Sequence, residues 1–308
     1  MSERRRGLIY GLCAYLLWGV FPLYFPLLEP TTPVEILAHR IVWSLVVLLI
    51  VLAVTRRWSW IRPLLRDRRQ MLLLSAASVT IALNWGVYIY GVNSGQVVQT
   101  SLGYFINPLV SVLFGVLLLK ERLRVTQWAA VGLGTLAVVV LTVDYAGLPW
   151  IALTLAFSFG TYGLLKKTLD MGAVESLSTE TAILAPAAAA YLLFLLATGN
   201  SAMATEGPGM ATLLASLGVI TVVPLLFFGA AATRLPLTWI GLLQYSAPVL
   251  QFLIGVFVYN EPMPASRWVG FGLVWSALVI LTIDSIMAVH RGRTPVDLEV
   301  DEAAQEAH

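Results

Sequence analysis

Charge, cysteine and histidine are scarce in this chain of 308 residues, and each scarcity excludes a class of protein. Only 12% of the residues are Asp, Glu, Lys or Arg, about half the share of a soluble domain, and the mean hydropathy is +0.83. A water-soluble fold is therefore excluded. The single cysteine, Cys13, rules out an intramolecular disulfide or a C-x-x-C pair. We expect it to be a small buried packing residue.

Motifs for nucleotide binding and catalysis are missing as well. The sequence has no G-x-x-x-x-G-K-[ST] loop, so this chain cannot be an ATP-driven pump by itself. Its histidines, His39, His290 and His308, belong to no H-E-x-x-H motif or acidic cluster, and there is no G-x-S-x-G elbow. We therefore expect no enzyme and no metal or cofactor site, and the charge pattern does not indicate nucleic-acid binding.

The apolar residues are gathered in ten blocks, most of them long enough to cross a bilayer as a helix. A hydrocarbon core of ~30 Å needs about 20 helical residues, and the blocks show no β-barrel alternation. We expect an all-α integral membrane protein with ten transmembrane helices, the first of which is too long to be a signal peptide. The blocks lie at roughly 7–25, 35–54, 71–91, 98–119, 126–143, 148–165, 177–197, 211–231, 237–258 and 267–288.

The basic residues predict the orientation, because cytoplasmic loops collect Lys and Arg. All but two of the 19 Lys and Arg residues lie at the termini or in every second loop, and the exceptions are Arg40 and Arg267. Both termini are therefore predicted to be cytoplasmic. Residues 1–6 form a short cytoplasmic N-terminus, and residues 289–308 are predicted to be a disordered acidic cytoplasmic tail.

An internal repeat relates the two halves of the chain. A shift of 140 residues without a gap superposes many identical residues, among them the seven pairs named below, which indicates a duplication. With five helices in each copy, residues 7–144 and 145–288 are predicted to be inverted repeats, which provide two similar packings for alternating access. The matched residues are Pro108 and Pro248, Gly115 and Gly255, Glu121 and Glu261, Trp128 and Trp268, Gly132 and Gly272, Thr142 and Thr282, and Asp144 and Asp284.

The sequence resembles the EamA-type permeases of the drug/metabolite transporter superfamily, and within them the RarD branch. The repeat carries the resemblance to the superfamily. The resemblance to the branch rests on E-I-L-A-H-R at 35–40, N-W-G-V-Y-I-Y at 84–90, S-L-G-Y-F-I-N-P at 101–108, S-T-E-T at 178–181 and L-Q-Y-S-A-P at 243–248. It implies a multi-pass permease of the bacterial plasma membrane for metabolites or drugs, linked to chloramphenicol but with no settled substrate.

Ionisable groups inside a bilayer are costly and are the first candidates for a solute site. Arg40 is predicted to bind an anionic or carbonyl group, or alternatively to reach the headgroups. His39 is expected either to titrate during transport or to make a structural hydrogen bond. Glu180 matches Arg40 under the 140-residue shift, so the two could line opposite ends of one pathway. The alternative for Glu180 is a stabilising position near a helix N-terminus.

Polar and aromatic side chains of helices three, four and nine complete the predicted substrate-binding set. Asn84 and Tyr88 share one face of helix three, and the alternative is hydrogen bonding between helices. Pro108 and Pro248 fall near mid-span, where each frees a backbone carbonyl; we predict hinges there, with simple packing kinks as the alternative. The remaining members of the set are Trp85, Tyr104, Asn107, Gln244, Tyr245 and Gln251.

These features favour a secondary transporter, an exporter of a small organic metabolite or drug, with a central cavity formed by helices two, three, four, seven, eight and nine. The expected partners are the small-molecule solute and membrane lipid, and the sequence leaves open whether the chain is a monomer or a homodimer. The alternative function is a membrane scaffold or sensor that does not transport, in which the tail or the loop between helices two and three would capture a soluble partner.

Overall fold

The structure is a computed structural model of the whole chain, and it describes residues 2–56, 58–119, 123–169 and 171–291. Every regular element in these ranges is a helix, which confirms the all-α prediction. The predicted acidic tail lies outside the described residues from 292 onward, and Glu121 lies outside them as well.

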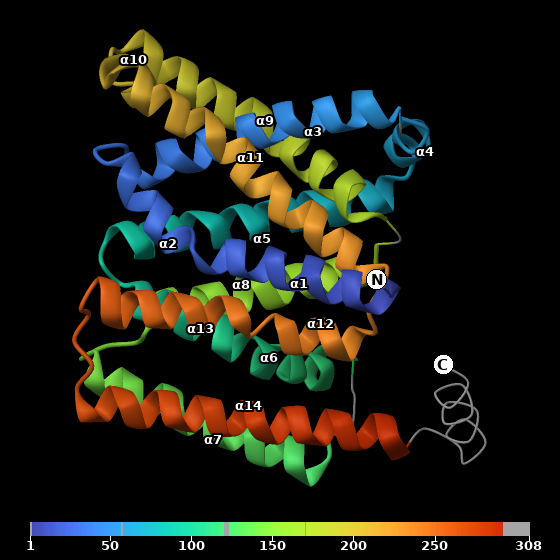
Figure 1. The fold of residues 1–308 in the computed structure, drawn as a ribbon, viewed down its shortest axis with the longest axis vertical. Helices are drawn as coiled ribbons and strands as arrows, with labels where there is room; N and C mark the ends of the chain where they lie inside the picture. Colours follow the sequence, from blue (N-terminus) through green and yellow to red (C-terminus); the bar gives the residue numbers. More distant parts are fainter. Residues whose placement is uncertain (1, 57, 120–122, 170, 292–308) are drawn as a thin grey trace. The chain divides into compact units, whose positions relative to one another are not determined.

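Each predicted apolar block corresponds to a helix or to a helix in two parts (Figure 1). The first block is α1 (Glu3–Gly19) followed by the short α2 (Phe21–Tyr24) and a 3₁₀ turn, η1 (Phe25–Leu28). The ninth block is α12 (Leu237–Leu243), α13 (Ser246–Leu253) and a π-helical turn, η2 (Ile254–Val258). The other blocks are α3 (Pro33–Thr55), α5 (Arg68–Asn93), α6 (Val97–Leu119), α7 (Val125–Asp144), α8 (Trp150–Lys167), α9 (Ala173–Ala197), α11 (Gly207–Ala232) and α14 (Ala265–Arg291), and the short α4 (Ile61–Arg66) and α10 (Ala202–Thr205) lie in loops.

Eight helices in the described ranges are long and apolar enough to cross a membrane. A ninth span results if α1 is counted together with the segment Phe21–Leu28, which is bent by 42° from it. The one predicted block left over is the sixth, at 148–165, which is α8; this helix has 18 residues, ends on Lys166 and Lys167, and is not among those eight. Eight or nine spans are therefore established, and the tenth stays a prediction.

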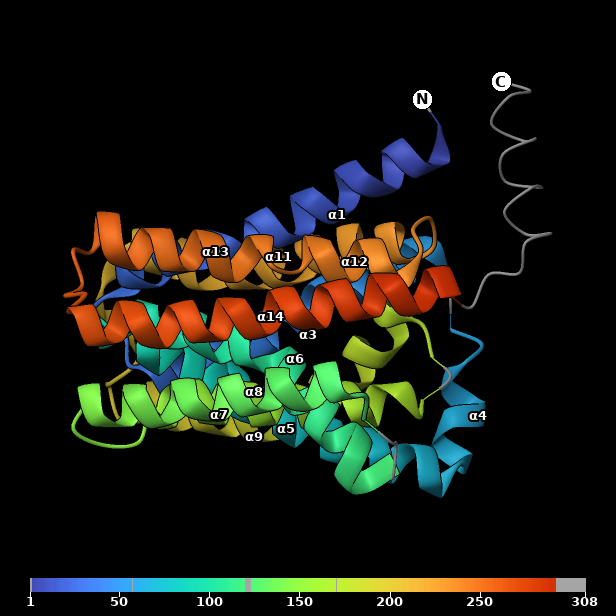
Figure 2. The ribbon, with the colours of Figure 1, turned by 90° about the horizontal axis from the view of Figure 1, so that it is seen from below.

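Contacts between Cα atoms divide the chain into two compact units, each of which contains segments of both predicted repeats. Unit 1 is Met1–Asn107 with Pro149–Met263, and unit 2 is Pro108–Leu148 with Pro264–His308. Within unit 1, α3 packs against α9 and α11, α5 packs against α8, and α1 packs against α11 and α13. In Figure 2, α1 is inclined to α11 and α13. The boundary in α6 falls between Asn107 and Pro108.

The bend of the first span follows from two prolines. Pro22 and Pro26 have no backbone N–H, so the carbonyls of Trp18 and Pro22, four residues earlier, lose their usual helical donors. Side chains from a distant segment replace those donors. The amide of Gln251 donates to the Trp18 carbonyl at 3.2 Å, and the Tyr259 hydroxyl donates to the Pro22 carbonyl at 2.8 Å. These bonds tie the bend to α13 and to the residue that follows η2.

In unit 2, α7 and α14 pack against each other in antiparallel fashion and exchange matching contacts at both ends. Near the start of α7, the Thr126 hydroxyl donates to Asp284 at 2.6 Å. At the other end, Ser266 donates to Asp144. Thr126 and Ser266 are 140 residues apart in the sequence, and so are Asp144 and Asp284. The two contacts are therefore equivalent, and a local two-fold axis relates α7 to α14.

Arginines reinforce both ends of this pair. Arg267 lies 2.9 Å from Asp144, and Arg124 lies 2.8 Å from Asp284. Between the ends, Ala130, Ala277, Leu281 and Leu109 form an apolar cluster. The pair thus has an apolar middle and charged ends, as expected of helices whose centres lie in hydrocarbon.

Candidate functional site

Arg40 lies in the interior of unit 1, on the face of α3 that contacts α11 and α5. Its guanidinium carbon is 4.1 Å from the centre of the Trp85 ring and 5.5 Å from that of Phe21. Its Nε donates to the hydroxyl of Thr221 at 3.0 Å. The residue is 4% exposed, and in the described part of the chain it makes no ion pair with an Asp or Glu. A cation held only by aromatic faces and a hydroxyl retains most of its capacity to bind an anion or a carbonyl.

Asn84 and Tyr104 are joined on neighbouring helices. The Tyr104 hydroxyl donates to Asn84 Oδ1 at 3.1 Å. The Asn84 amide nitrogen donates to the Leu155 carbonyl at 3.1 Å and to the Ser158 hydroxyl at 3.0 Å, both on α8. This amide therefore makes the hydrogen bonds between helices that are the alternative to a ligand role, and it fixes the position of the Tyr104 ring.

Tyr88 lies on the same face of α5, buried between Phe25 and Tyr104, with ring centres at 6.0 and 5.7 Å. Its hydroxyl is buried and has no hydrogen-bond partner among the residues that the structure describes. An unpaired buried hydroxyl is uncommon because it costs free energy. Together with Arg40 it gives unit 1 two interior polar groups with unused hydrogen-bonding capacity.

A row of aromatic rings continues from Tyr104 toward Glu180. The centre of the Phe159 ring lies 5.8 Å from that of Tyr104 and 6.2 Å from that of Tyr162. The Tyr162 hydroxyl then donates to Glu180 at 3.0 Å. Glu180 is fully buried, and it also accepts hydrogen bonds from Lys166 at 3.1 Å and from Ser176 at 2.6 Å. The structure therefore brings Arg40, Trp85, Tyr88, Tyr104 and Asn84 into one group and connects it through rings to a separate, paired carboxylate.

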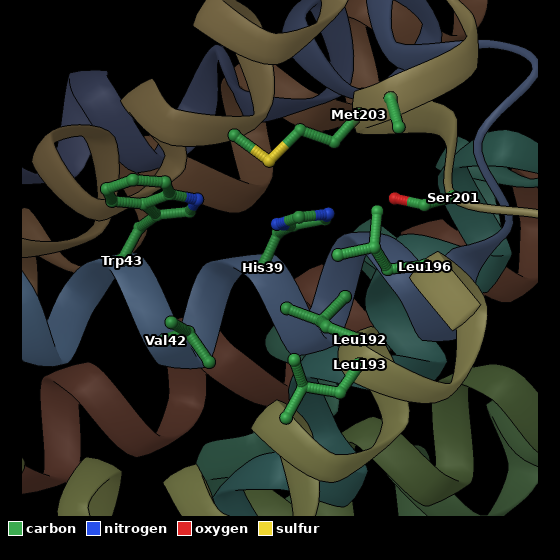
Figure 3. A pocket seen from close by; sticks show the side chains of 9 residues that line it. His39, Val42, Trp43, Leu192, Leu193, Leu196, Ser201 and Met203 are labelled. Atoms are coloured by element: carbon green, nitrogen blue, oxygen red, sulfur yellow. The ribbon is translucent and has the colours of Figure 1, made fainter. Parts of the chain in front are cut away.

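His39 is not part of this group, although it precedes Arg40 in the sequence. Successive residues of a helix point about 100° apart, and the His39 ring faces α9 and α10 (Figure 3). Its Nε2 lies 3.8 Å from Glu35, whose Oε1 accepts the backbone N–H of Ala202 at 2.8 Å.

Apart from Tyr104, the predicted residues of helices four and nine lie outside this group. Gln244 and Tyr245 form the break between α12 and α13, and both are half-buried. Pro248 follows that break in the first turn of α13, whereas α6 continues through Pro108 without an interruption. Asn107 is the last residue of unit 1 before Pro108. Gln251 supports the bend of the first span through Trp18.

Comparisons with known proteins place the chain in a family. The profile of the EamA-like transporter family matches residues 5–143. Protein RarD of Streptomyces exfoliatus is 55% identical over 296 residues, which cover 96% of this chain and 94% of that protein. The chain belongs to the RarD branch of the EamA-like transporters. Further similarity is found to the uncharacterized transporter YojE of Bacillus subtilis, which is 44% identical over 289 residues, or 92% of this chain and 96% of that one.

A solved structure described as a crystal structure of a protein shares the fold of this RarD-type chain. It covers 90% of this chain and 96% of its own, with a TM-score of 0.57 and 18% sequence identity. Membership of the family and the apolar helices together establish a multi-pass membrane transporter of the bacterial inner membrane that handles a small-molecule solute.

Sequence reasoning missed several members of the interior of this RarD-type transporter. Thr221 and Phe21 contact Arg40, and Ser158 supports Asn84. Tyr162 and Lys166 bind Glu180, and their spacing of four residues on one helix is the signal that could have found them. No grouping of three or more His, Cys, Asp or Glu suitable for a metal occurs among the residues that the structure describes.

Proposed function

We propose that this RarD-type protein is a secondary transporter that exports a small organic metabolite or drug by alternating access. The single observation that carries the proposal is the buried guanidinium of Arg40, which lies on the Trp85 ring without an acidic partner among the described residues. A buried charge is costly unless it is paired. The solute would supply the missing anionic or carbonyl group when it occupies the interior of unit 1.

The row of rings from Tyr88 through Tyr104 and Phe159 to Tyr162 supports a pathway along α5, α6 and α8. Aromatic faces accommodate an amphipathic solute without demanding a particular hydrogen-bond pattern. In the proposed cycle, Arg40 lies toward the outer end of this path and Glu180 toward the inner end. Lys166 neutralises Glu180 while the solute is absent.

We also propose that ten spans form two inverted repeats, 7–144 and 145–288, with both termini in the cytoplasm. The reciprocal contacts of α7 and α14, with Thr126 on Asp284 and Ser266 on Asp144, support an inverted relation at an offset of 140 residues. The family profile at residues 5–143 nearly coincides with the first proposed repeat. The inverted arrangement is tested with a single cysteine placed either at Arg124 or at Pro264, two positions that the 140-residue offset matches. The measurement is the side of the membrane from which each cysteine reacts with a membrane-impermeant thiol reagent. We expect Arg124→Cys to react from the cytoplasm and Pro264→Cys from outside, and reaction from the same side would contradict the inversion.

The transport proposal is tested by flux in proteoliposomes against a panel of amphipathic metabolites and drugs. We expect at least one solute to be carried by the wild type. Arg40→Ala should lose most of this flux, because the solute loses its charged partner, and Asn84→Ala and Glu180→Gln should reduce it less. The matched control is Arg267→Ala, which removes the other arginine outside the basic loops and lies in unit 2. We expect this variant, once shown to be folded, to retain flux. Equal flux in Arg40→Ala and the wild type would remove the assigned site, and no flux of any solute would favour a membrane scaffold or sensor.

A further inference from the structure

A pocket of about 220 Å³ lies between the first half of α3, the end of α9 and α10, all within unit 1. Its walls are almost entirely apolar (Figure 3). The lining residues are His39, Val42, Trp43, Leu192, Leu193, Leu196, Ser201, Met203 and Ala204.

His39 is the polar group at the centre of this pocket. Figure 3 shows its ring between Met203 and Trp43 on one side and Leu192 and Leu196 on the other. The residue is 3% exposed, and neither ring nitrogen has a hydrogen-bond partner in the described part of the chain. The carboxylate of Glu35 has its Oε1 at 3.8 Å from Nε2, too far for a hydrogen bond, and this oxygen accepts the backbone N–H of Ala202.

An imidazole in apolar surroundings without a partner costs free energy, because a donor and an acceptor both lose water. An acyl chain or an alkane would fill the pocket but leave both nitrogens unpaired. A molecule with an apolar ring and one hydroxyl would cover the leucine and methionine walls and pair with the imidazole as well. The volume is suitable, because an apolar cavity of ~150 Å³ in another protein holds benzene.

We propose that this pocket binds a small phenol-like compound whose hydroxyl pairs with His39. The leucines at its rim give access from the bilayer, because Leu193 is 65% exposed and Leu196 57% exposed on the surface of a membrane-spanning helix. The site is separate from the proposed transport site, since Arg40 faces Trp85 and Thr221. It therefore stands whether or not Arg40 binds the transported solute.

The test is binding of 4-fluorophenol to the full chain, followed by ¹⁹F NMR in nanodiscs of phosphatidylethanolamine and phosphatidylglycerol. Fluorobenzene, which lacks the hydroxyl, is the matched probe, and empty nanodiscs correct for partition into lipid. We expect saturable binding of 4-fluorophenol to the wild type, at least fivefold tighter than that of fluorobenzene. His39→Phe should remove this preference and leave fluorobenzene binding unchanged, whereas His39→Gln, which keeps a hydrogen-bonding side chain, should retain part of it.

Two tryptophan variants distinguish binding in the pocket from binding elsewhere on the lipid-facing surface. Leu196→Trp narrows the pocket at an exposed position and should weaken both probes at least fivefold. Leu136→Trp, at a position 49% exposed on α7, should leave both unchanged. Thermal unfolding checks that each variant is folded. The proposal is overturned if the wild type shows no saturable 4-fluorophenol binding above empty nanodiscs, if His39→Phe keeps the full preference, or if the two tryptophan variants behave alike.

Discussion

The α7–α14 pair of unit 2 and the interior of unit 1 both contain buried charged groups, but they hold them differently. In unit 2, Asp144 is the last residue of α7 and Asp284 lies in the C-terminal part of α14, and each contacts both a hydroxyl and an arginine. In unit 1, Arg40 lies two turns into a spanning helix and makes one hydrogen bond, to Thr221. Charges paired in this way stabilise the packing of two helices. A buried cation with one neutral partner has no comparable structural use, because its burial is not offset by an opposite charge.

The largest expected difference between the two regions is the effect of a glycine-to-alanine substitution on the free energy of unfolding. Gly218 of α11 lies against α3, where an added Cβ would stand 2.3 Å from the Trp43 carbonyl oxygen. Gly132 of α7 has nothing within 4 Å of that position. We expect Gly218→Ala to lower the free energy of unfolding by ~3 kcal/mol, since backbone must move, and Gly132→Ala to raise it by up to ~1 kcal/mol, since alanine favours the helix. Denaturant titration in micelles measures both, and equal effects would show that α3 and α11 are not so closely packed.

The two arginines outside the basic loops should respond in opposite ways. Arg267→Met leaves the buried Asp144 without its ion-pair partner, and we expect a loss of about 1–3 kcal/mol in the free energy of unfolding. Arg40→Met replaces a cation that has no acidic partner in the described ranges by an apolar chain of similar length. Its free energy of unfolding should stay equal or rise. A larger loss for Arg40→Met than for Arg267→Met, in the same micelles, would mean that Arg40 has a structural role.

Glu180 is an intermediate case, because it is buried in unit 1 but fully paired. Glu180→Gln keeps the shape but removes the charge that Lys166 and Tyr162 bind, and we expect a loss of ~1 kcal/mol. Lys166→Met should cost more than this, because it leaves the buried Glu180 carboxylate without its ion-pair partner. A double variant that loses no more than Glu180→Gln alone would establish the pair as one unit. Strictly additive losses would contradict the coupling.

The sequence predicted the positions of the helices well because the length and hydropathy of a block are local properties. The bend at Pro22 was not predicted, since the residues that stabilise it, Gln251 and Tyr259, come from the other end of the chain. Gln251 was predicted to bind the solute, and in the structure its amide donates to the carbonyl of Trp18. A glutamine inside a span must find a partner, and the sequence does not tell whether that partner is a ligand or a carbonyl freed by a proline.

The candidate site was predicted in part for a related reason. Helical spacing puts Asn84 and Tyr88 on one face of a helix and Arg40 within a span, but it cannot say which neighbouring helix each face meets. His39 and Arg40 were therefore assigned to one site, although they face different helices. Lys166 was interpreted as a loop charge because it ends α8, and its contact with Glu180 depends on how α8 packs beside α9.

The central claim is that the solute path passes Arg40 and opens alternately to the two sides of the membrane. The most direct measurement is the reactivity of Thr221→Cys, in a Cys13→Ser background, toward a membrane-impermeant thiol reagent added from either side. Thr221 contacts Arg40 and is buried, and a cysteine there changes the side chain little. The account predicts reaction from both sides, slowed by a solute that the protein transports. A cysteine at this position that reacts from neither side, in protein that still transports, would contradict it.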